Sequence, residues 1–419
     1  MVKDVADSNR PNCAQGGLHC KRKRALAGLA VFTALALGMA GCGTKATGPA
    51  SGGSAGGNTG GTVKIGWIGG LTGPLSEFVL DSKEGADFAK DEINQKGGVL
   101  GKKIELIYAD TQMDPQKARE AVQRYISSDK VAAIDGDYYS PNTLAIIPLT
   151  EQSKMPIATP NSNADEVTSQ GAKYIVRVAA SSSYNASVPV EYGLSKLKLK
   201  TWVVFGGSDG YSKSNVNAAV SFLKSHNGTL LGTESYDRAT TKDFSNLLLK
   251  YKDNQPDAIF LAGGPSDTAL IVKQARGLGI KSKFLSTNSA AKDAVWAIGG
   301  EALQDTVMVA DFAGIATNYK DFAEQSTNDF IDAFKASHGG KIPSYDNAHG
   351  YDTLRIISQA IQAANSTDGA KVAEAMHKLQ YRGALGTLKV QPNGAVVITM
   401  YIMKWNHGKM EIIGTATAQ

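Results

Sequence analysis

From residue 62 onward, short β-rich apolar runs alternate with segments whose apolar residues have helical spacing. The first predicted strands are 63–69, 103–110 and 131–136, and the first predicted helices are 82–98 and 115–128. Asp114 followed by Pro115 marks the start of the second helix, because Asp is a preferred N-cap and proline fits the first helical turn. Strands that alternate with helices predict a parallel sheet covered by helices on both faces.

A second series of the same kind begins near residue 201. Its predicted strands are 201–207, 229–236, 257–264 and 283–288, and its predicted helices are 212–225, 243–252 and 266–277. Two later helices are predicted at 319–337 and 345–363, and 395–413 predicts a β-hairpin that turns at Asn406-His407-Gly408. The predicted fold class is therefore α/β, with two doubly wound parallel-sheet units of similar plan.

The loops at the carboxyl ends of these strands are the predicted binding region, because open α/β sheets bind ligands there. These loops are 70–82, 136–143, 158–165, 206–212, 263–268 and 286–292. They contain many Ser, Thr, Asn, Tyr and Gly residues and few residues of the types that catalyse reactions. Two such units facing each other predict a cleft lined for hydrogen bonding, with Tyr138 and Tyr139 in it.

Two glycine-rich turns offer enzymatic alternatives. The turn at 66–73 lacks the Gly-x-Gly-x-x-Gly spacing of dinucleotide-binding proteins, so a cofactor is not expected. The turn at 206–210 matches Gly-x-Ser-x-Gly between a predicted strand and helix, which makes a secreted hydrolase with Ser208 as nucleophile the alternative from another class. No histidine stands at a strand-end loop of this unit. The six scattered histidines also form no metal-binding pair, so no metal site is predicted.

The N-terminal segment has the features of an export signal. Four basic residues, 21–24, precede the uncharged stretch 25–41, which is too short for a comfortable membrane span. Such a segment is typical of a secretory signal peptide. Small residues before Cys42 resemble a bacterial lipobox, so we expect residues 1–41 to be removed and Cys42 to carry a lipid. Residues 42–61, rich in Gly, Ser and Thr, then form a flexible linker to the membrane.

Net charge argues against a nucleic-acid partner. The chain of 419 residues has a formal charge of +5, but six basic and two acidic residues in 1–41 account for +4 of it. That leaves +1 for the remainder, which is nearly neutral and lacks the excess charge of a nucleic-acid surface. A monomer is expected, anchored by its lipid on the extracytoplasmic face of the cell membrane.

Several segments together resemble the leucine/isoleucine/valine-binding family, the substrate-binding proteins of ABC importers. The matching segments are 70–78, 92–118, 139–148 and 155–168, within a resemblance that runs over about 62–415. The resemblance implies the type I periplasmic-binding fold, with two lobes joined by crossings near 180, 311 and 394. The implied N-terminal lobe is 62–180 with 312–394, and the C-terminal lobe is 181–311 with 395–419.

The resemblance also implies ligand-binding residues. Ser140 matches the serine that holds the ligand carboxylate, and Tyr211 matches an aromatic wall from the second lobe. Asn288, however, stands where the family has a Glu that neutralises the ligand ammonium, and Pro265 stands where it has a Tyr. The expected set is Glu77, Phe78, Tyr138, Tyr139, Ser140, Asn161, Ser162, Asn163, Tyr211 and Asn288. Asp137, Asp209 and Glu77 are the candidate acids for the role of the missing Glu.

These features predict a binding protein without enzymatic activity. It would capture a small polar solute by lobe closure, a branched-chain or other amino acid first of all, and deliver it to the permease subunits of an ABC importer. An amide or urea-like compound and a small, possibly aromatic, carboxylate remain open as ligands. A ligand sensor of the same fold remains open as a function, beside the minor hydrolase alternative.

Overall fold

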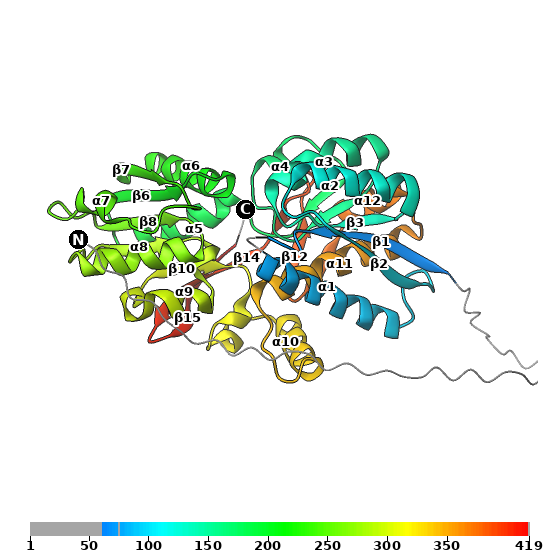
Figure 1. The fold of residues 1–419 in the computed structure, drawn as a ribbon. Helices are drawn as coiled ribbons and strands as arrows, with labels where there is room; N and C mark the ends of the chain where they lie inside the picture. Colours follow the sequence, from blue (N-terminus) through cyan, green and yellow to red (C-terminus); the bar gives the residue numbers. More distant parts are fainter. Residues whose placement is uncertain (1–60, 74–75, 418–419) are drawn as a thin grey trace, which may run out of the picture. The chain divides into compact units, whose positions relative to one another are not determined.

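A computed structural model describes residues 61–73 and 76–417, which belong to one compact unit, Gly57–Gln419. The predicted signal peptide, Cys42 and all but the last residue of the predicted linker lie outside the described residues. Two sheets of mainly parallel strands, each with helices packed against it, confirm the predicted fold class (Figure 1). Among the described residues, no helix combines the length and the apolar character of a membrane span.

The first sheet is wholly parallel, with the strand order β2-β1-β3-β4-β5. Its strands are β1 (Thr62–Gly69), β2 (Lys103–Asp110), β3 (Ala133–Asp135), β4 (Ile157–Thr159) and β5 (Ile175–Arg177). Its helices are α1 (Ser76–Gln95), α2 (Pro115–Arg124) with the π-helical turn η1 (Tyr125–Asp129), α3 (Ser140–Ser153), α4 (Glu166–Ser169), α11 (Tyr345–Ala364) and α12 (Gly369–His377). Helices α1 and α11 pack together on one face, and α2 and α3 pack together on the other.

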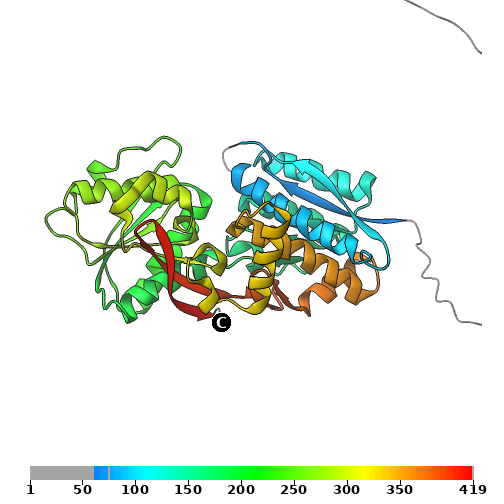
Figure 2. The ribbon, with the colours of Figure 1, turned by 90° about the horizontal axis from the view of Figure 1, so that it is seen from below.

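The second sheet has the order β15-β14-β10-β9-β8-β6-β7. Its strands are β6 (Thr201–Gly207), β7 (Thr229–Tyr236), β8 (Ala258–Ala262), β9 (Lys283–Ser286), β10 (Val307–Ala310), β14 (Thr399–Asn406) and β15 (Lys409–Thr417). The strands from β7 to β10 are parallel, whereas the hairpin β14–β15 adds two antiparallel strands at one edge (Figure 2). The hairpin turn falls between Asn406 and Lys409, as predicted.

Helices α5 (Ser182–Ser195) and α6 (Gly210–Ser225) pack together against the second sheet, and α8 (Pro265–Gly277) packs against α9 (Asp293–Gly299). Shorter elements are α7 (Ser245–Leu249), η2 (Asn288–Ala290), η3 (Gly300–Leu303), η4 (Ala313–Ile315) and η5 (Tyr319–Asp321). Helix α10 (Gln325–Ser337) packs its Phe334 edge-to-face on Phe88 of α1, with ring centroids 5.5 Å apart. A third, antiparallel sheet of β11 (Gln380–Gly383), β12 (Gly386–Val390) and β13 (Val396–Val397) was not predicted.

Some predicted element boundaries were wrong. The first helix was expected from residue 82 but begins at Ser76, so Glu77 and Phe78 belong to its first turn. The helix expected over 319–337 is two elements, η5 and α10. The segment just before η5 runs beside β15, where Thr317 N–H donates to Met410 O at 2.9 Å, and the regular helix begins only after it. The helix expected over 243–252 is the single short helix α7.

The chain passes between the two sheets three times. The first passage is 178–181, between β5 and α5, and the second begins at Asp311, after β10. The third comes at Ile398, because β13 still pairs with β12 while β14 already pairs with β10. The expected passage near 394 is therefore shifted by a few residues. Asp311 Oδ2 accepts a hydrogen bond from Ala180 N–H at 3.1 Å, which ties the first two passages together.

Asp135, the last residue of β3 in the first sheet, provides a test of packing. Its side chain is fully buried, and no hydrogen bond is recorded for either carboxylate oxygen. Burial raises its pKa well above the usual value, so the folded protein holds a proton that the unfolded chain loses near pH 4. Stability therefore falls as pH rises above that value.

We accordingly expect Asp135→Asn to raise the free energy of unfolding at pH 7, because the neutral amide can be buried without binding a proton; about 1 kcal/mol is a typical size for the effect of one substitution. The gain should vanish near pH 3.5, where Asp135 is protonated in both states. Urea unfolding of both proteins at the two pH values measures the difference. An equal gain at both pH values would show that the carboxylate charge is not its cause.

Candidate functional site

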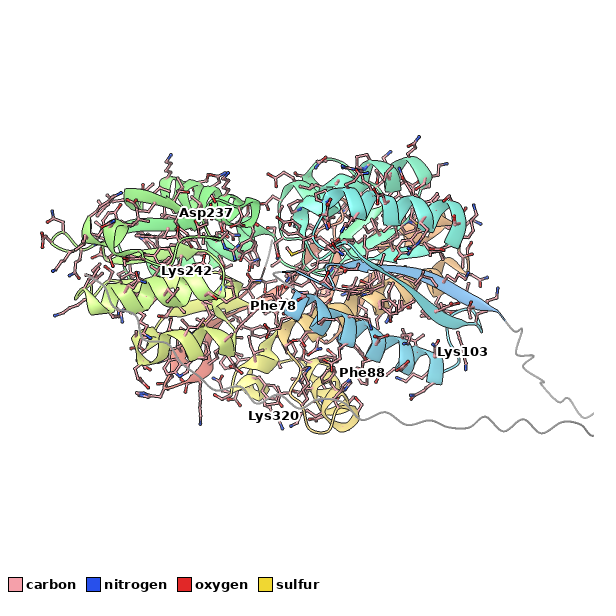
Figure 3. The ribbon with its side chains drawn as sticks, viewed as in Figure 1. Phe78, Phe88, Lys103, Asp237, Lys242 and Lys320 are labelled. Atoms are coloured by element: carbon pink, nitrogen blue, oxygen red, sulfur yellow. The ribbon has the colours of Figure 1, made fainter. Side chains whose placement is uncertain are left out.

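A cavity of about 120 Å³ lies where the carboxyl ends of the two sheets face each other. Below, the first sheet with the helices packed on it is called the first lobe, and the second sheet with its helices the second lobe. Residues of both lobes line the cavity: Phe78, Tyr138, Tyr139, Ser140, Pro141, Asn161, Asn163 and Tyr345 from the first lobe, and Asp209, Tyr211, Arg238, Gly264, Pro265, Asn288, Ser289 and Lys292 from the second. Phe78, at the start of α1, lies where the lobes meet (Figure 3). The cavity is called the cleft below.

Strand order explains why these loops meet. In the first sheet β1 has β2 on one side and β3 on the other, and in the second sheet β6 stands in the same way between β7 and β8. The loops that leave such a pair of strands diverge to opposite faces, which opens a crevice between them. The loops after β3, β6 and β8 supply Tyr138, Asp209 and Gly264 to the cleft.

The loop after β3 is held by Asp137. Its carboxylate accepts hydrogen bonds from Thr111 Oγ1 at 2.9 Å, Asn142 Nδ2 at 2.8 Å and Tyr139 N–H at 2.9 Å. Gly136 before it has a φ of +124°, and a Cβ there would collide with Ile68 O on β1. Asp137 is thus fully buried and occupied by the loop itself, and it does not line the cleft as a partner for a ligand ammonium.

The segment after β4 is placed partly as expected. Asn161 and Asn163 line the cleft, and Asn163 Nδ2 donates to Ala180 O at 2.7 Å. Ser162 instead turns inward, where its Oγ donates to Asp137 O at 2.8 Å and lies 2.6 Å from Thr143 Oγ1. Ser140 begins α3 and lines the cleft, but the next positions offer no backbone donors: Pro141 has no N–H, and the N–H groups of Asn142 and Thr143 donate to Tyr139 O at 3.0 and 3.1 Å.

A chain of hydrogen bonds crosses the cleft from one lobe to the other. Asn161 Nδ2 donates to Tyr138 Oη at 2.6 Å, and Tyr345 Oη donates to Asn161 Oδ1 at 3.2 Å. From the second lobe, Asn288 Nδ2 donates to Tyr345 Oη at 2.8 Å, and Asn288 Oδ1 lies 2.9 Å from Tyr211 Oη. Burial raises the pKa of Tyr211 to about 12, so its hydroxyl keeps its proton at neutral pH.

Lys292 makes the second link between the lobes. Its Nζ lies 2.8 Å from Asp346 Oδ2 and 3.5 Å from the centre of the Phe78 ring. Asp346 is nearly inaccessible to solvent, with 2% of its side chain exposed, and its Oδ1 accepts a hydrogen bond from Tyr138 Oη at 2.7 Å. The ammonium of Lys292 is therefore held by a carboxylate and an aromatic face of the opposite lobe.

Arg238 is the second cation of the cleft. Its Nη1 donates to Asp209 Oδ2 at 3.1 Å, and its Nε lies 3.4 Å from Asp267 Oδ2. Its guanidinium lies against Gly264, where a Cβ would collide with Nη2. Burial opposes the ionisation of Asp209, but Arg238 and Ser212 outweigh it and hold the pKa of Asp209 below its usual value.

The structure does not bring every expected residue to the cleft. Glu77 is exposed and lines a different hollow, beside Asp81 and Asp293. Ser208 lies between β6 and α6 as a nucleophile would, and its backbone N–H donates to Tyr236 O at 2.8 Å. Within residues 61–73 and 76–417, no hydrogen bond joins its side chain to a histidine. Asp209 instead caps α6, accepting from Ser212 N–H at 3.1 Å.

Three polar residues that line the cleft were missed from the sequence, Arg238, Lys292 and Tyr345, and so was Asp346, which binds Lys292 from the adjoining hollow. Arg238 follows β7 by two residues, so the strand-end rule that selected the other loops would have found it. Lys292 stands in the predicted loop 286–292 but was not singled out. Tyr345 and Asp346 begin a helix far along the chain, and nothing in their local sequence places that helix end at the cleft.

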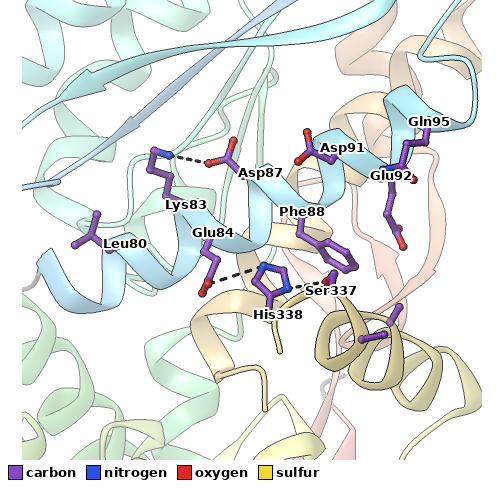
Figure 4. A pocket seen from close by; sticks show the side chains of 12 residues that line it. Leu80, Lys83, Glu84, Asp87, Phe88, Asp91, Glu92, Gln95, Ser337 and His338 are labelled. Atoms are coloured by element: carbon purple, nitrogen blue, oxygen red, sulfur yellow. Dashed lines mark hydrogen bonds and ion pairs between the residues drawn. The ribbon is translucent and has the colours of Figure 1, made fainter. Parts of the chain in front are cut away.

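A larger hollow of about 860 Å³ runs along α1 and α10 (Figure 4). In it Lys83 Nζ lies 2.7 Å from Asp87 Oδ2, and His338 Nε2 lies 3.9 Å from Glu84 Oε1. Its described lining comes from these two helices and from His338, which directly follows α10, and from none of the strand-end loops. The described residues also contain no cluster of three or more His, Cys, Asp or Glu placed to hold a metal ion.

Comparisons with known proteins agree on one family. The family model described as periplasmic binding protein matches residues 62–409. A Leu/Ile/Val-binding protein homologue of Brucella melitensis is 27% identical over 83% of this chain and 92% of its own. A leucine-, isoleucine-, valine-, threonine- and alanine-binding protein of Pseudomonas aeruginosa is 26% identical over 80% and 87%. The crystal structure of a leucine-binding protein of Thermotoga maritima has a TM-score of 0.76 and 30% identity, and covers 84% of this chain and 98% of its own.

Proposed function

We propose that this chain, which belongs to the periplasmic binding protein family, is the extracytoplasmic solute-binding component of an ABC importer. It captures a small solute that carries a carboxylate and presents it to the permease subunits. The relatives named above bind branched-chain amino acids, so these amino acids are the first ligands to test. Small aromatic carboxylates are the second, because five aromatic side chains line the cleft: Phe78, Tyr138, Tyr139, Tyr211 and Tyr345.

The observation that carries the proposal is the convergence of anion-binding groups from both lobes on one small cavity. The first lobe contributes the Ser140 hydroxyl, and the second contributes Arg238 and the start of α8 at Pro265. Helix starts and guanidinium groups both favour carboxylates. The neutral tyrosine hydroxyls and aromatic rings beside them suit the remainder of a small organic molecule.

Binding of the ligand is coupled to closure of the two lobes. A ligand that touches residues of both lobes stabilises the form in which those residues are close together. The inter-lobe contacts of Lys292 with Asp346 and of Asn288 with Tyr345 are of this kind. We propose that the permease recognises this closed form, and that a lipid on Cys42 keeps the protein close to the membrane where the permease lies.

The Ser140 side chain offers a direct test. We expect Ser140→Ala to weaken binding of the solute at least tenfold, about 1.4 kcal/mol, because the hydroxyl at the start of α3 is lost. Unfolding stability should change little, since Ser140 Oγ accepts only a long hydrogen bond, from Ala164 N–H at 3.3 Å. Calorimetric titration with branched-chain amino acids and small carboxylates measures the change, with Ser183→Ala, at an exposed position of α5, as the control. An unchanged dissociation constant would remove Ser140 from the site.

A further inference from the structure

We infer that the cleft selects carboxylates that lack an α-ammonium group, because Lys292 of the chain itself occupies the cation position beside Asp346. This inference rests on the proposed function and specifies its ligand class. The compounds it favours are branched-chain or aromatic carboxylates without an α-amino group, rather than the amino acids that have the same carbon skeletons.

The acids around the cleft all have partners within the protein. Asp209 is paired with Arg238 and caps α6, and Asp267 accepts from Tyr236 Oη at 2.7 Å and from Gly264 N–H at 3.0 Å. Asp137 is enclosed in its own loop, and Asp346 is bonded to Lys292 and Tyr138. Among the described residues that line the cleft itself, Asp209 is the one carboxylate, and it is already paired with Arg238.

An ammonium buried without such a partner loses its hydration and gains no compensating charge. Asn288, in the loop after β9, cannot supply that charge, because its amide is neutral. Its Oδ1 already faces Tyr211 Oη and its Nδ2 already donates to Tyr345 Oη. An amino acid in this cleft would therefore bring a charge that the surrounding groups do not match.

Lys292 fills the position that an ammonium would otherwise take. It comes from the second lobe, yet its Nζ is held by the first, between Asp346 and the face of Phe78. Only 18% of its side chain is exposed. An aromatic face beside a buried carboxylate is the environment that a ligand ammonium needs, and here it is satisfied before any ligand arrives.

The remaining cation of the cleft suits the other end of the ligand. The recorded contacts of Arg238 use Nη1 and Nε, toward Asp209 and Asp267, while Nη2 lies against Gly264 at the start of α8. A guanidinium has five N–H donors, so Arg238 retains donors for a carboxylate. Together with Ser140 it provides an anion-binding region, and the described lining of the cleft provides no region that would bind a cation.

Matched pairs of compounds test this inference with the unmodified protein. The pairs are L-leucine with 4-methylpentanoate, L-valine with 3-methylbutanoate and L-phenylalanine with 3-phenylpropanoate, which differ only in the ammonium group. Calorimetric titration gives a dissociation constant for each. We expect the compound without the ammonium to bind at least tenfold more tightly in each pair that binds.

A variant of Lys292 tests the cause of the preference. In Lys292→Met the Asp346 carboxylate is free to pair with a ligand ammonium, so the ratio of the two dissociation constants should shift at least tenfold toward the amino acid. The double variant Lys292→Met/Asp346→Asn should lose that shift. Lys283→Met, at the exposed start of β9, is the control and should leave the ratio unchanged.

Each result decides one claim. Tighter binding of the amino acid by the unmodified protein would overturn the inference and leave the proposed function intact. An unaltered ratio in Lys292→Met would show that Lys292 is not the cause of the preference. If none of the six compounds binds, both the inference and the carboxylate ligand of the proposed function are wrong.

Discussion

Replacing Arg238 with Met is expected to weaken binding of the carboxylate ligand at least a hundredfold, about 2.7 kcal/mol. The change removes the guanidinium and also leaves Asp209 and Asp267 without their cation at the wall of the cleft. Two uncompensated carboxylates would repel an anionic ligand, so the loss should exceed that of a single hydrogen bond.

Calorimetric titration with whichever of the six paired compounds binds most tightly to the unmodified protein measures this effect. Arg382→Met is a suitable control, because Arg382 is exposed in the third sheet, where its Nε donates to Thr387 Oγ1 at 3.2 Å and lies 3.5 Å from Glu324 Oε2. We also expect binding to recover partly in Arg238→Met/Asp209→Asn, which removes one of the two carboxylate charges that lost their cation. A dissociation constant within threefold of the unmodified value would exclude Arg238 from ligand binding.

The second large effect is on stability, at the passage between the lobes. Asp311→Ala is expected to lower the free energy of unfolding by about 3–5 kcal/mol, the range for breaking one side of a buried ion pair. Asp311 and His349 are both buried, with 3.4 Å between Oδ2 and Nε2, and Asp311 also accepts from Ala180 N–H. The substitution thus leaves a buried imidazole and a backbone N–H without their partner.

The pH dependence identifies the cause of that loss. Burial lowers the pKa of His349, but the Asp311 charge and the contact with Tyr345 O outweigh it and raise the pKa above the usual value. A raised histidine pKa stabilises the fold fully below about pH 6.5 and loses this contribution as pH rises through the raised value. The difference between Asp311→Ala and the unmodified protein should therefore be largest at acidic pH.

Urea unfolding at pH 5.5 and pH 9 measures both effects. Asp332→Ala is the control, because Asp332 is an exposed residue of α10 and such surface substitutions change stability little. A difference that grows as pH rises would contradict the assigned role of the His349 charge.

The sequence resemblance to the leucine/isoleucine/valine-binding family is confirmed by the family model and by relatives of that name. Most strands and helices were also predictable, because β-rich runs and helical spacing reflect local preferences of the backbone. Asp114, which accepts from Gln116 N–H at 2.7 Å before Pro115, is one such local feature. The third sheet was not predictable in this way, since its short strands are stabilised by their neighbours rather than by their own composition.

The proposed binding residues also differ in how far the sequence could predict them. Tyr138, Tyr139, Ser140 and Tyr211 follow strands at the carboxyl ends, so a rule of topology selects them. Ser162 belongs to an expected segment, yet its hydroxyl turns inward because Asp137 O and Thr143 Oγ1 are its partners. Whether a side chain in a loop faces a cleft or its own backbone depends on contacts with distant residues, which the local sequence does not record.

The sequence alone determined the alternation of strands and helices, the strand-end loops that form a cleft, and the neutral amide of Asn288 where the family has an acid. Only the tertiary structure decided how the charges of the cleft are arranged. It joined Lys292 to Asp346 across 54 positions of the chain, and Arg238 to Asp209 and Asp267. The physical reason is that a pair of charges depends on distance in space, and at these separations that distance is set by the packing of two sheets.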